Sequence, residues 1–200
     1  MGDRTMTSII KVDTIQNTAG ATPTAADLGI NVSGSLLQVV EYHTTSPFTI
    51  NGASIKLFDQ SITTKQTNSK IMILLSLGRS SFNQDVDLAL ALGYKTGSGS
   101  SASTNYTSTH GSSYSRQTIS GIGSFFSQDT SEPGGGSWDG GYNISSVNFN
   151  KLHSPNVAAG TVLNYGCFGG SDGTFYVGRS RSGGTDNGYD TSLTLMEIAG

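Results

Sequence analysis

Hydroxyl, acidic and imidazole side chains of this sequence could support catalysis where their spacing matches that of a known catalytic motif. Gly169 to Gly173 reads G-x-S-x-G, the pattern of a hydrolase nucleophile elbow, with Ser171 at its centre. That elbow requires a strand-to-helix turn and a histidine later in the chain. No histidine follows Ser171, and strand-like runs flank it on both sides. We therefore interpret the segment as a hairpin tip formed at Asp172-Gly173.

The sequence matches neither the spacing of a metal-binding site nor that of a nucleotide-binding motif. The histidines and the cysteine stand alone, without the paired spacing of a metal site; they are His43, His110, His153 and Cys167. The glycine-rich run at 97–102 loosely resembles a dinucleotide fingerprint, but no helical pattern follows it. We expect no metal, no cofactor and a buried Cys167.

Three carboxylates could serve glycoside cleavage, which needs two acids held several ångströms apart. Asp129, Glu132 and Asp139 lie in a single glycine-rich loop, and such loops rarely hold that geometry without support. Polysaccharide cleavage is therefore a minor alternative. The sequence predicts no catalytic residue and a protein that is not an enzyme.

The composition restricts the partners. Only 12% of residues are charged, the net charge is −3, and the 11 basic residues are scattered, which argues against nucleic acid. No apolar run approaches the roughly 20 residues that span a membrane. Residues 1–30 contain no apolar core of a signal peptide. We expect synthesis in the cytoplasm and no membrane insertion.

From Leu36 onward the sequence alternates between short strand-like runs and turn residues, as in an antiparallel sandwich or jelly roll. An Asn51-Gly52 turn is expected between the first two runs. In 86–94 the strict alternation favours a strand over a helix. The expected strands are 36–42, 55–58, 61–64, 71–77, 86–94, 118–126, 142–152, 161–168, 174–179 and 192–198.

Residues 1–35 differ from the head domain predicted for 36–200. They contain one alternating run followed by a stretch of small, turn-forming residues that cannot bury much apolar surface. We interpret 1–35 as an extended arm for docking and trimerisation. Its candidate contact residues are Ile9, Ile10, Val12 and Ile15.

The run from Ile71 to Leu75 is apolar at every position, so both faces of this strand need a cover. A sandwich covers one face with its core and leaves the other to water. A symmetric contact between subunits would cover the second face. Met72 and Leu74 are therefore candidate oligomer residues. The alternative is cover by a loop of the same chain.

Two long polar loops, 96–118 and 127–141, carry the candidate binding residues. These residues are Tyr106, His110, Tyr114 and Trp138. Exposed aromatic rings beside acids and amides can stack on sugars, and loops on a rigid sandwich often carry binding sites. The alternative is that these aromatic residues only fix their loops in place.

Both ends of the chain resemble a known group of proteins. SIIKVDTIQNTAG at 8–20 and SLTLMEIAG at 192–200 resemble the terminal segments of tail-fibre and other virion proteins of phages, notably those of cyanobacteria and marine bacteria. KIMILLSL at 70–77, ALALGYKTG at 89–97 and LHSPN at 152–156 match the strand pattern of that group. His153 stands where the group more often has Asp.

This resemblance implies a homotrimeric jelly-roll head, similar to those of C1q and tumour necrosis factor, in a virion protein. It implies that the N-terminal arm contacts sister subunits or other virion proteins. The leading hypothesis is a tail fibre or fibre head whose two long loops face outward, and attachment to a host-surface glycan would follow from that placement. A capsid decoration or cement protein is the close alternative. A stand-alone lectin and an enzyme that degrades host polysaccharide are further alternatives.

Overall fold

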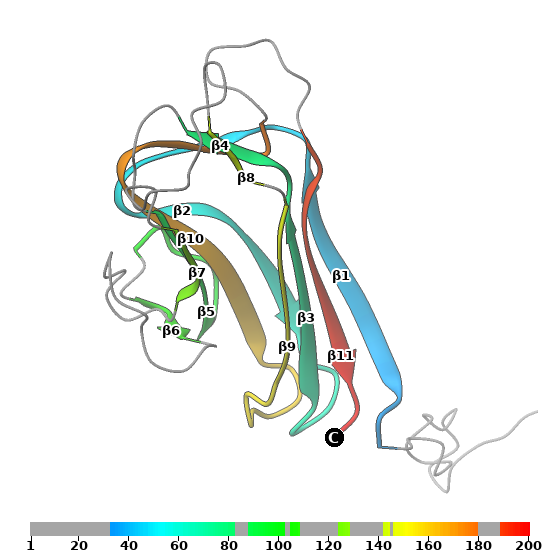
Figure 1. The fold of residues 1–200 in the computed structure, drawn as a ribbon. Coiled ribbons are helices and arrows are strands. Elements are labelled where there is room, and N and C mark those ends of the chain that lie inside the picture. The colour runs from blue at the N-terminus through cyan, green and yellow to red at the C-terminus, as the bar shows by residue number, and fades with distance from the viewer. Residues whose placement is uncertain are drawn as a thin grey trace, which may run out of the picture.

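The computed structural model describes residues 33–82, 88–102, 105–108, 124–128, 142–144, 146–179 and 189–200. Within these ranges the chain forms β-strands and no α-helix, so the prediction of an all-β fold is confirmed. No helix in this part of the chain is long and apolar enough to cross a membrane. The strands form two antiparallel sheets that pack as a sandwich (Figure 1).

The smaller sheet has four strands in the order β1-β11-β3-β9. Its strands are β1 (Leu36–Thr44), β11 (Thr191–Ile198), β3 (Lys70–Leu77) and β9 (Val147–His153). The last strand of the chain thus lies between the first and the third. This sheet is called the four-stranded sheet below.

The larger sheet is built around β10 (Val162–Val177), which pairs along one edge with β2 (Phe48–Thr63). Its other edge pairs first with β5 (Leu88–Thr96) and then with β4 (Ser80–Phe82). Short strands extend this sheet, namely β6 (Thr107–Ser108) and β7 (Ser124–Gln128) on β5, and β8 (Tyr142–Ile144) on β4.

The strand pairs are nested along the chain. β1 pairs with β11, β2 with β10, β3 with β9, β4 with β8 and β5 with β7. The first strand therefore pairs with the last, and each later pair lies inside the previous one. Most contacts consequently join segments far apart in the sequence.

Two predicted turns are wrong. Asp172-Gly173 does not form a hairpin but lies inside β10, where the pairing with β2 shifts between Ser171 and Phe175. Asn51-Gly52 lies inside β2, and Gly52, whose φ is 108°, is the partner of Ser171 at this irregularity. Glycine permits the local bend without ending either strand. Ser171 is buried in β10, so the expected hairpin tip does not exist.

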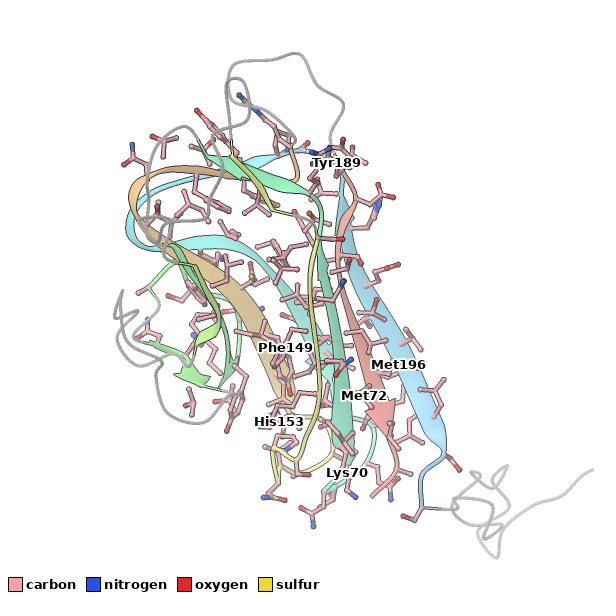
Figure 2. The ribbon with its side chains drawn as sticks, in the orientation of Figure 1. Lys70, Met72, Phe149, His153, Tyr189 and Met196 are labelled. Atoms are coloured by element: carbon pink, nitrogen blue, oxygen red, sulfur yellow. The ribbon has the colours of Figure 1, made fainter. Side chains whose placement is uncertain are left out.

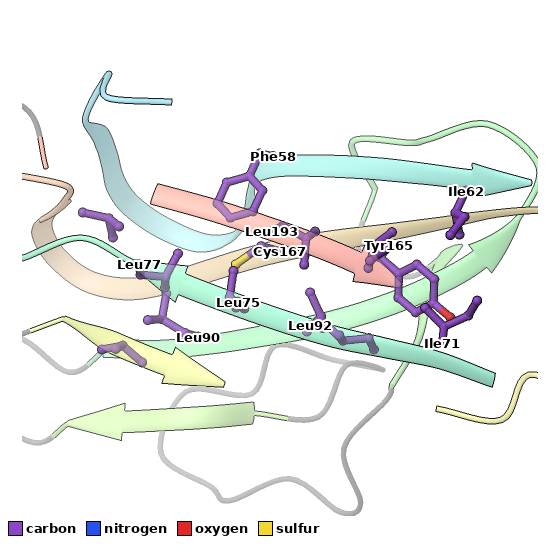
Figure 3. Close-up of a cluster of buried hydrophobic side chains, with 14 of the residues drawn as sticks. Phe58, Ile62, Ile71, Leu75, Leu77, Leu90, Leu92, Tyr165, Cys167 and Leu193 are labelled. Carbon is purple, nitrogen blue, oxygen red and sulfur yellow. The ribbon is translucent and has the colours of Figure 1, made fainter. Parts of the chain in front are cut away.

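The hydrophobic core lies between the two sheets (Figure 3). Leu75 and Leu77 of β3 and Leu193 of β11 face Tyr165 and Cys167 of β10. Cys167 is fully buried as predicted, and burial raises the pKa of its thiol. The strand predicted at 86–94 is also confirmed as β5, which contributes Leu90 and Leu92.

A buried acid joins the last strand to the turn between β2 and β3. The Glu197 carboxylate accepts hydrogen bonds from the backbone N–H groups of Lys65, at 2.8 Å, and Gln66, at 3.2 Å. The side-chain amide of Gln38 on β1 donates a further hydrogen bond to it. Because Glu197 is fully buried, this cluster fixes one end of the sandwich.

Candidate interaction surface on the four-stranded sheet

The outer face of the four-stranded sheet is defined by the alternation of its strands. In β11 the odd-numbered residues from Thr191 to Glu197 are buried, and the even-numbered residues from Ser192 to Ile198 are partly exposed. In β3 the buried residues are Ile71, Ile73, Leu75 and Leu77. The residues between them, which include Met72 and Leu74, therefore point away from the core.

A row of apolar side chains crosses this outer face from edge to edge. Val39 of β1 pairs in register with Met196 of β11. Met196 pairs in turn with Met72 of β3, and Met72 pairs with Leu152 of β9. Val39 is 49% exposed and Leu152 is 45% exposed. Figure 2 shows Met72 and Met196 on the neighbouring strands β3 and β11. These four residues are called the apolar strip.

Further apolar side chains border the apolar strip on both sides. Leu36 is 54% exposed and pairs with Ile198, which lies two residues after Met196 on β11. Leu74, 41% exposed, lies two residues after Met72 on β3 and faces outward as well. The apolar area thus extends over three successive levels of the sheet.

Among the described residues that point outward from these strands, the charged ones lie beside the apolar strip and not within it. Lys70 pairs with Ile198 on one side, and Glu41 pairs with Thr194 on the other. The remaining outward positions carry hydroxyl and amide side chains, namely Ser76, Ser192, Thr194, Asn148 and Asn150, together with His43 at the far end of β1. The face has an apolar centre and a polar border.

Such a face differs from the usual solvated face of an antiparallel sheet, which is polar. Contiguous exposed apolar area marks an interaction site on soluble proteins. Interface centres also lack charge and are enriched in Met. The apolar strip shares its lack of charge and its methionines with the centres of protein interfaces.

Two of the oligomer residues that the sequence suggested lie on this face. Met72 and Leu74 both point outward, and no described loop of the chain buries Leu74. The sequence analysis missed Val39, Leu152 and Met196, because their strands read as ordinary alternating strands when taken singly. The other candidates, Ile9, Ile10, Val12 and Ile15, lie outside the described residues.

The expectation that Tyr106 is an exposed binding residue is wrong. Its ring is 3% exposed and contacts the Phe168 ring edge-on, with 4.9 Å between the centroids. Its hydroxyl donates a hydrogen bond to Asn164 Oδ1 at 2.7 Å and accepts one from the Ser100 backbone N–H at 2.8 Å. Tyr106 instead fixes its loop on the larger sheet. His110, Tyr114 and Trp138 lie outside the described residues.

Asn164 extends this contact into a buried polar network on the outer side of β10. Its side-chain amide donates to Asp59 Oδ2 at 2.8 Å and to Ser61 Oγ at 2.9 Å, both on β2. Lys56 pairs with the other oxygen of Asp59 at 2.8 Å. The alternation around Leu163 and Tyr165 could have placed Asn164 on this side. Nothing in the sequence could have predicted that the loop that begins at Gly97 buries Asn164.

A second polar contact lies between the sheets at the end of β9. The Nδ1 atom of His153 is 2.8 Å from the Tyr165 hydroxyl, and the His153 ring lies 4.3 Å from that of Tyr94, centroid to centroid. Burial, followed by the charge of Lys151, lowers the pKa of His153. Burial also raises the pKa of Tyr165. His153 is labelled near the lower end of β9 in Figure 2.

No group of three or more His, Cys, Asp or Glu side chains in the described ranges is placed to hold a metal ion. In comparisons with known proteins, no family model and no curated protein matches the sequence.

Proposed function

We propose that this chain is a structural subunit that associates with copies of itself through the outer face of the four-stranded sheet. The apolar strip carries this proposal. A second copy covers Val39, Met72, Met196 and Leu152, which water otherwise contacts. Burial of apolar area stabilises such a contact by roughly 25 cal/mol per Å² before the costs of association.

The charges beside the apolar strip favour self-association over an unrelated partner. Lys70 and Glu41 lie on opposite sides of it, so each copy offers both an acid and a base. In a closed ring of three copies, one side of this patch on each subunit contacts the opposite side of the patch on the next subunit, so the two sides must complement each other. One positive and one negative group at the border of the patch meet this requirement.

The proposed head is a jelly roll that forms a homotrimer. The nested pairing of β1 with β11, β2 with β10, β3 with β9 and β5 with β7 supports a jelly-roll chain path. The trimer follows from the resemblance of the two end segments, at 8–20 and 192–200, to phage virion proteins with such heads. We therefore propose a virion protein, as a tail fibre or fibre head.

The native mass of the purified full-length chain tests the central claim. Light scattering after size exclusion is expected to give three times the monomer mass of 20.8 kDa. A monomer across the micromolar range would overturn the proposal. A stable dimer would retain self-association and overturn the trimer.

Placement in the particle tests the virion assignment separately. Antibody labelling of intact particles is expected at the tail, and adsorption to host cells is expected to decrease when the antibody is present. Labelling at the capsid surface would overturn the tail fibre in favour of a decoration protein. Absence of the chain from purified particles would overturn the virion assignment altogether.

A further inference from the structure

We propose that protonation of His153 weakens self-association through the apolar strip, so that the assembly is held together at neutral pH and loosened in acid. The inference rests on the proposed function, because it concerns the regulation of the same face. It is carried by the position of His153 beside Leu152 and by the contacts of its ring.

His153 and Leu152 are the last two residues of β9 and lie on opposite faces of it. Leu152 points outward as a member of the apolar strip, opposite Met72, while His153 points between the sheets, opposite Ile71. Among the described strands, β9 pairs only with β3 and forms one edge of its sheet. The inward side chains of β9 therefore hold this edge against the larger sheet.

Nδ1 of His153 can accept the hydroxyl hydrogen of Tyr165 only while the His153 ring is neutral. Tyr165 is fully buried, and its hydroxyl hydrogen needs an acceptor, which Nδ1 of a neutral ring provides at 2.8 Å. Protonation places a hydrogen on Nδ1, so two donors then face each other. Either the Tyr165 hydroxyl turns and loses its acceptor, or the His153 ring moves away.

Among the residues that the structure describes, the groups that contact the ring supply no compensating negative charge. Lys151 lies on the same face of β9 two residues earlier, and its positive charge opposes protonation. The aromatic rings of Tyr94 on β5 and Tyr165 on β10 contact the His153 ring from the opposite sheet, and burial raises the pKa of Tyr165. Neither of the ion pairs formed between described residues includes His153.

A displaced His153 ring moves the end of β9 and with it Leu152. Because Leu152 is the outermost residue of the apolar strip on that side, its displacement disturbs the fit of a second copy. The buried contact thereby couples a single protonation to the shape of the outer face.

Sedimentation equilibrium of the full chain tests this coupling at about pH 8 and about pH 5, on either side of the usual range of histidine. The association constant is expected to fall at least about fivefold in acid, the lower end of typical coupling between linked sites. His153→Gln retains an acceptor for Tyr165 but cannot titrate in this range. This variant is expected to associate equally well at both pH values.

Two matched controls use the other histidines of the chain. His110→Gln removes a titratable ring outside the described residues and is expected to keep the pH dependence. His43→Gln removes the ring that lies on the outer face itself, at the far end of β1, and is also expected to keep it. Loss of the pH dependence in His43→Gln would assign the effect to the outer face and overturn the coupling through His153. Lys151→Gln offers a second measurement that leaves His153 in place. Without the opposing charge, protonation occurs more readily, so the loss of association should move to higher pH.

The outcomes separate this inference from the proposed function. A chain that is monomeric at both pH values overturns self-association itself. A chain that associates with the same constant at both pH values retains the proposed function and overturns the coupling. A pH dependence that persists in His153→Gln also overturns the coupling.

Discussion

Met72 and Met196 are register partners on the neighbouring strands β3 and β11, and both point away from the core. The two thioether side chains lie at the centre of this outer face, and the subunit itself buries each of them only in part. Methionine adapts its shape to an apolar partner surface and is used at contact surfaces for this reason. The pair therefore marks the centre of the proposed contact.

A charge at this centre should abolish self-association without unfolding the subunit. Met72→Lys is expected to give a monomer by light scattering, because the buried contact would leave the ammonium group without a partner. The free energy of unfolding of the subunit should change by less than about 0.5 kcal/mol, as for other surface substitutions.

Val162→Lys is the matched control for this substitution. Val162 is 38% exposed on β10 of the larger sheet, so the change also replaces an exposed apolar residue by lysine. It should leave the native mass unchanged. If both variants remain fully associated, the outer face of the four-stranded sheet is not the contact surface.

Loss of the Glu197 carboxylate should destabilise the fold. Glu197→Ala removes the acceptor of the Lys65 and Gln66 backbone N–H groups, and this is expected to cost about 2 kcal/mol or more. Urea unfolding, monitored by far-UV circular dichroism, measures the difference in the free energy of unfolding between wild type and variant. Glu197→Gln keeps one acceptor oxygen and should lose less. Equal stability of wild type and Glu197→Ala would contradict the role of this cluster.

The sequence predicted the strands well where each could be recognised from its own alternation. β5 and β11 each match a predicted run within a few residues, because one face of each strand is buried and apolar residues recur with a period of two. β3 matches its predicted run as well, although it is apolar on both faces. The prediction was wrong at Asp172-Gly173 because the same residues that form a tight turn also form a bulge in a long strand. The partner strand decides between these two outcomes, and a single segment contains no information about its partner.

The candidate surface could be predicted only in part for a similar reason. Met72 and Leu74 were identified because β3 is apolar on both faces. Val39, Met196 and Leu152 join them through the register of four strands that are distant in the sequence. Tyr106 was misplaced because its polar surroundings in the sequence concealed the contacts with Phe168 and Asn164.

The Tyr106 hydroxyl should contribute to stability. Tyr106→Phe removes the acceptor of the Ser100 N–H and the donor to Asn164, which is expected to cost about 1 to 2 kcal/mol in urea unfolding. Tyr189→Phe is the matched control, because Tyr189 is exposed. This change should leave the free energy of unfolding the same. A Tyr106→Phe chain as stable as wild type would show that the loop is held by the ring alone.

The stability of the fold should decrease as the pH falls below the ordinary histidine pKa of 6.5. Burial and Lys151 lower the pKa of His153 in the folded chain. The unfolded chain therefore binds the proton first, and stability falls with decreasing pH in the range between the two pKa values. Above 6.5 both states are neutral at this ring, and its contribution to stability is fully present.

Urea unfolding of the Met72→Lys chain at a series of pH values isolates this effect from association. The free energy of unfolding should decline on acidification through this range, and His153→Gln should remove most of the decline. His43→Gln, which changes an exposed side chain, should leave it intact. The same decline in His153→Gln would assign it to other groups, because the partly buried imidazole of His153 would then be absent.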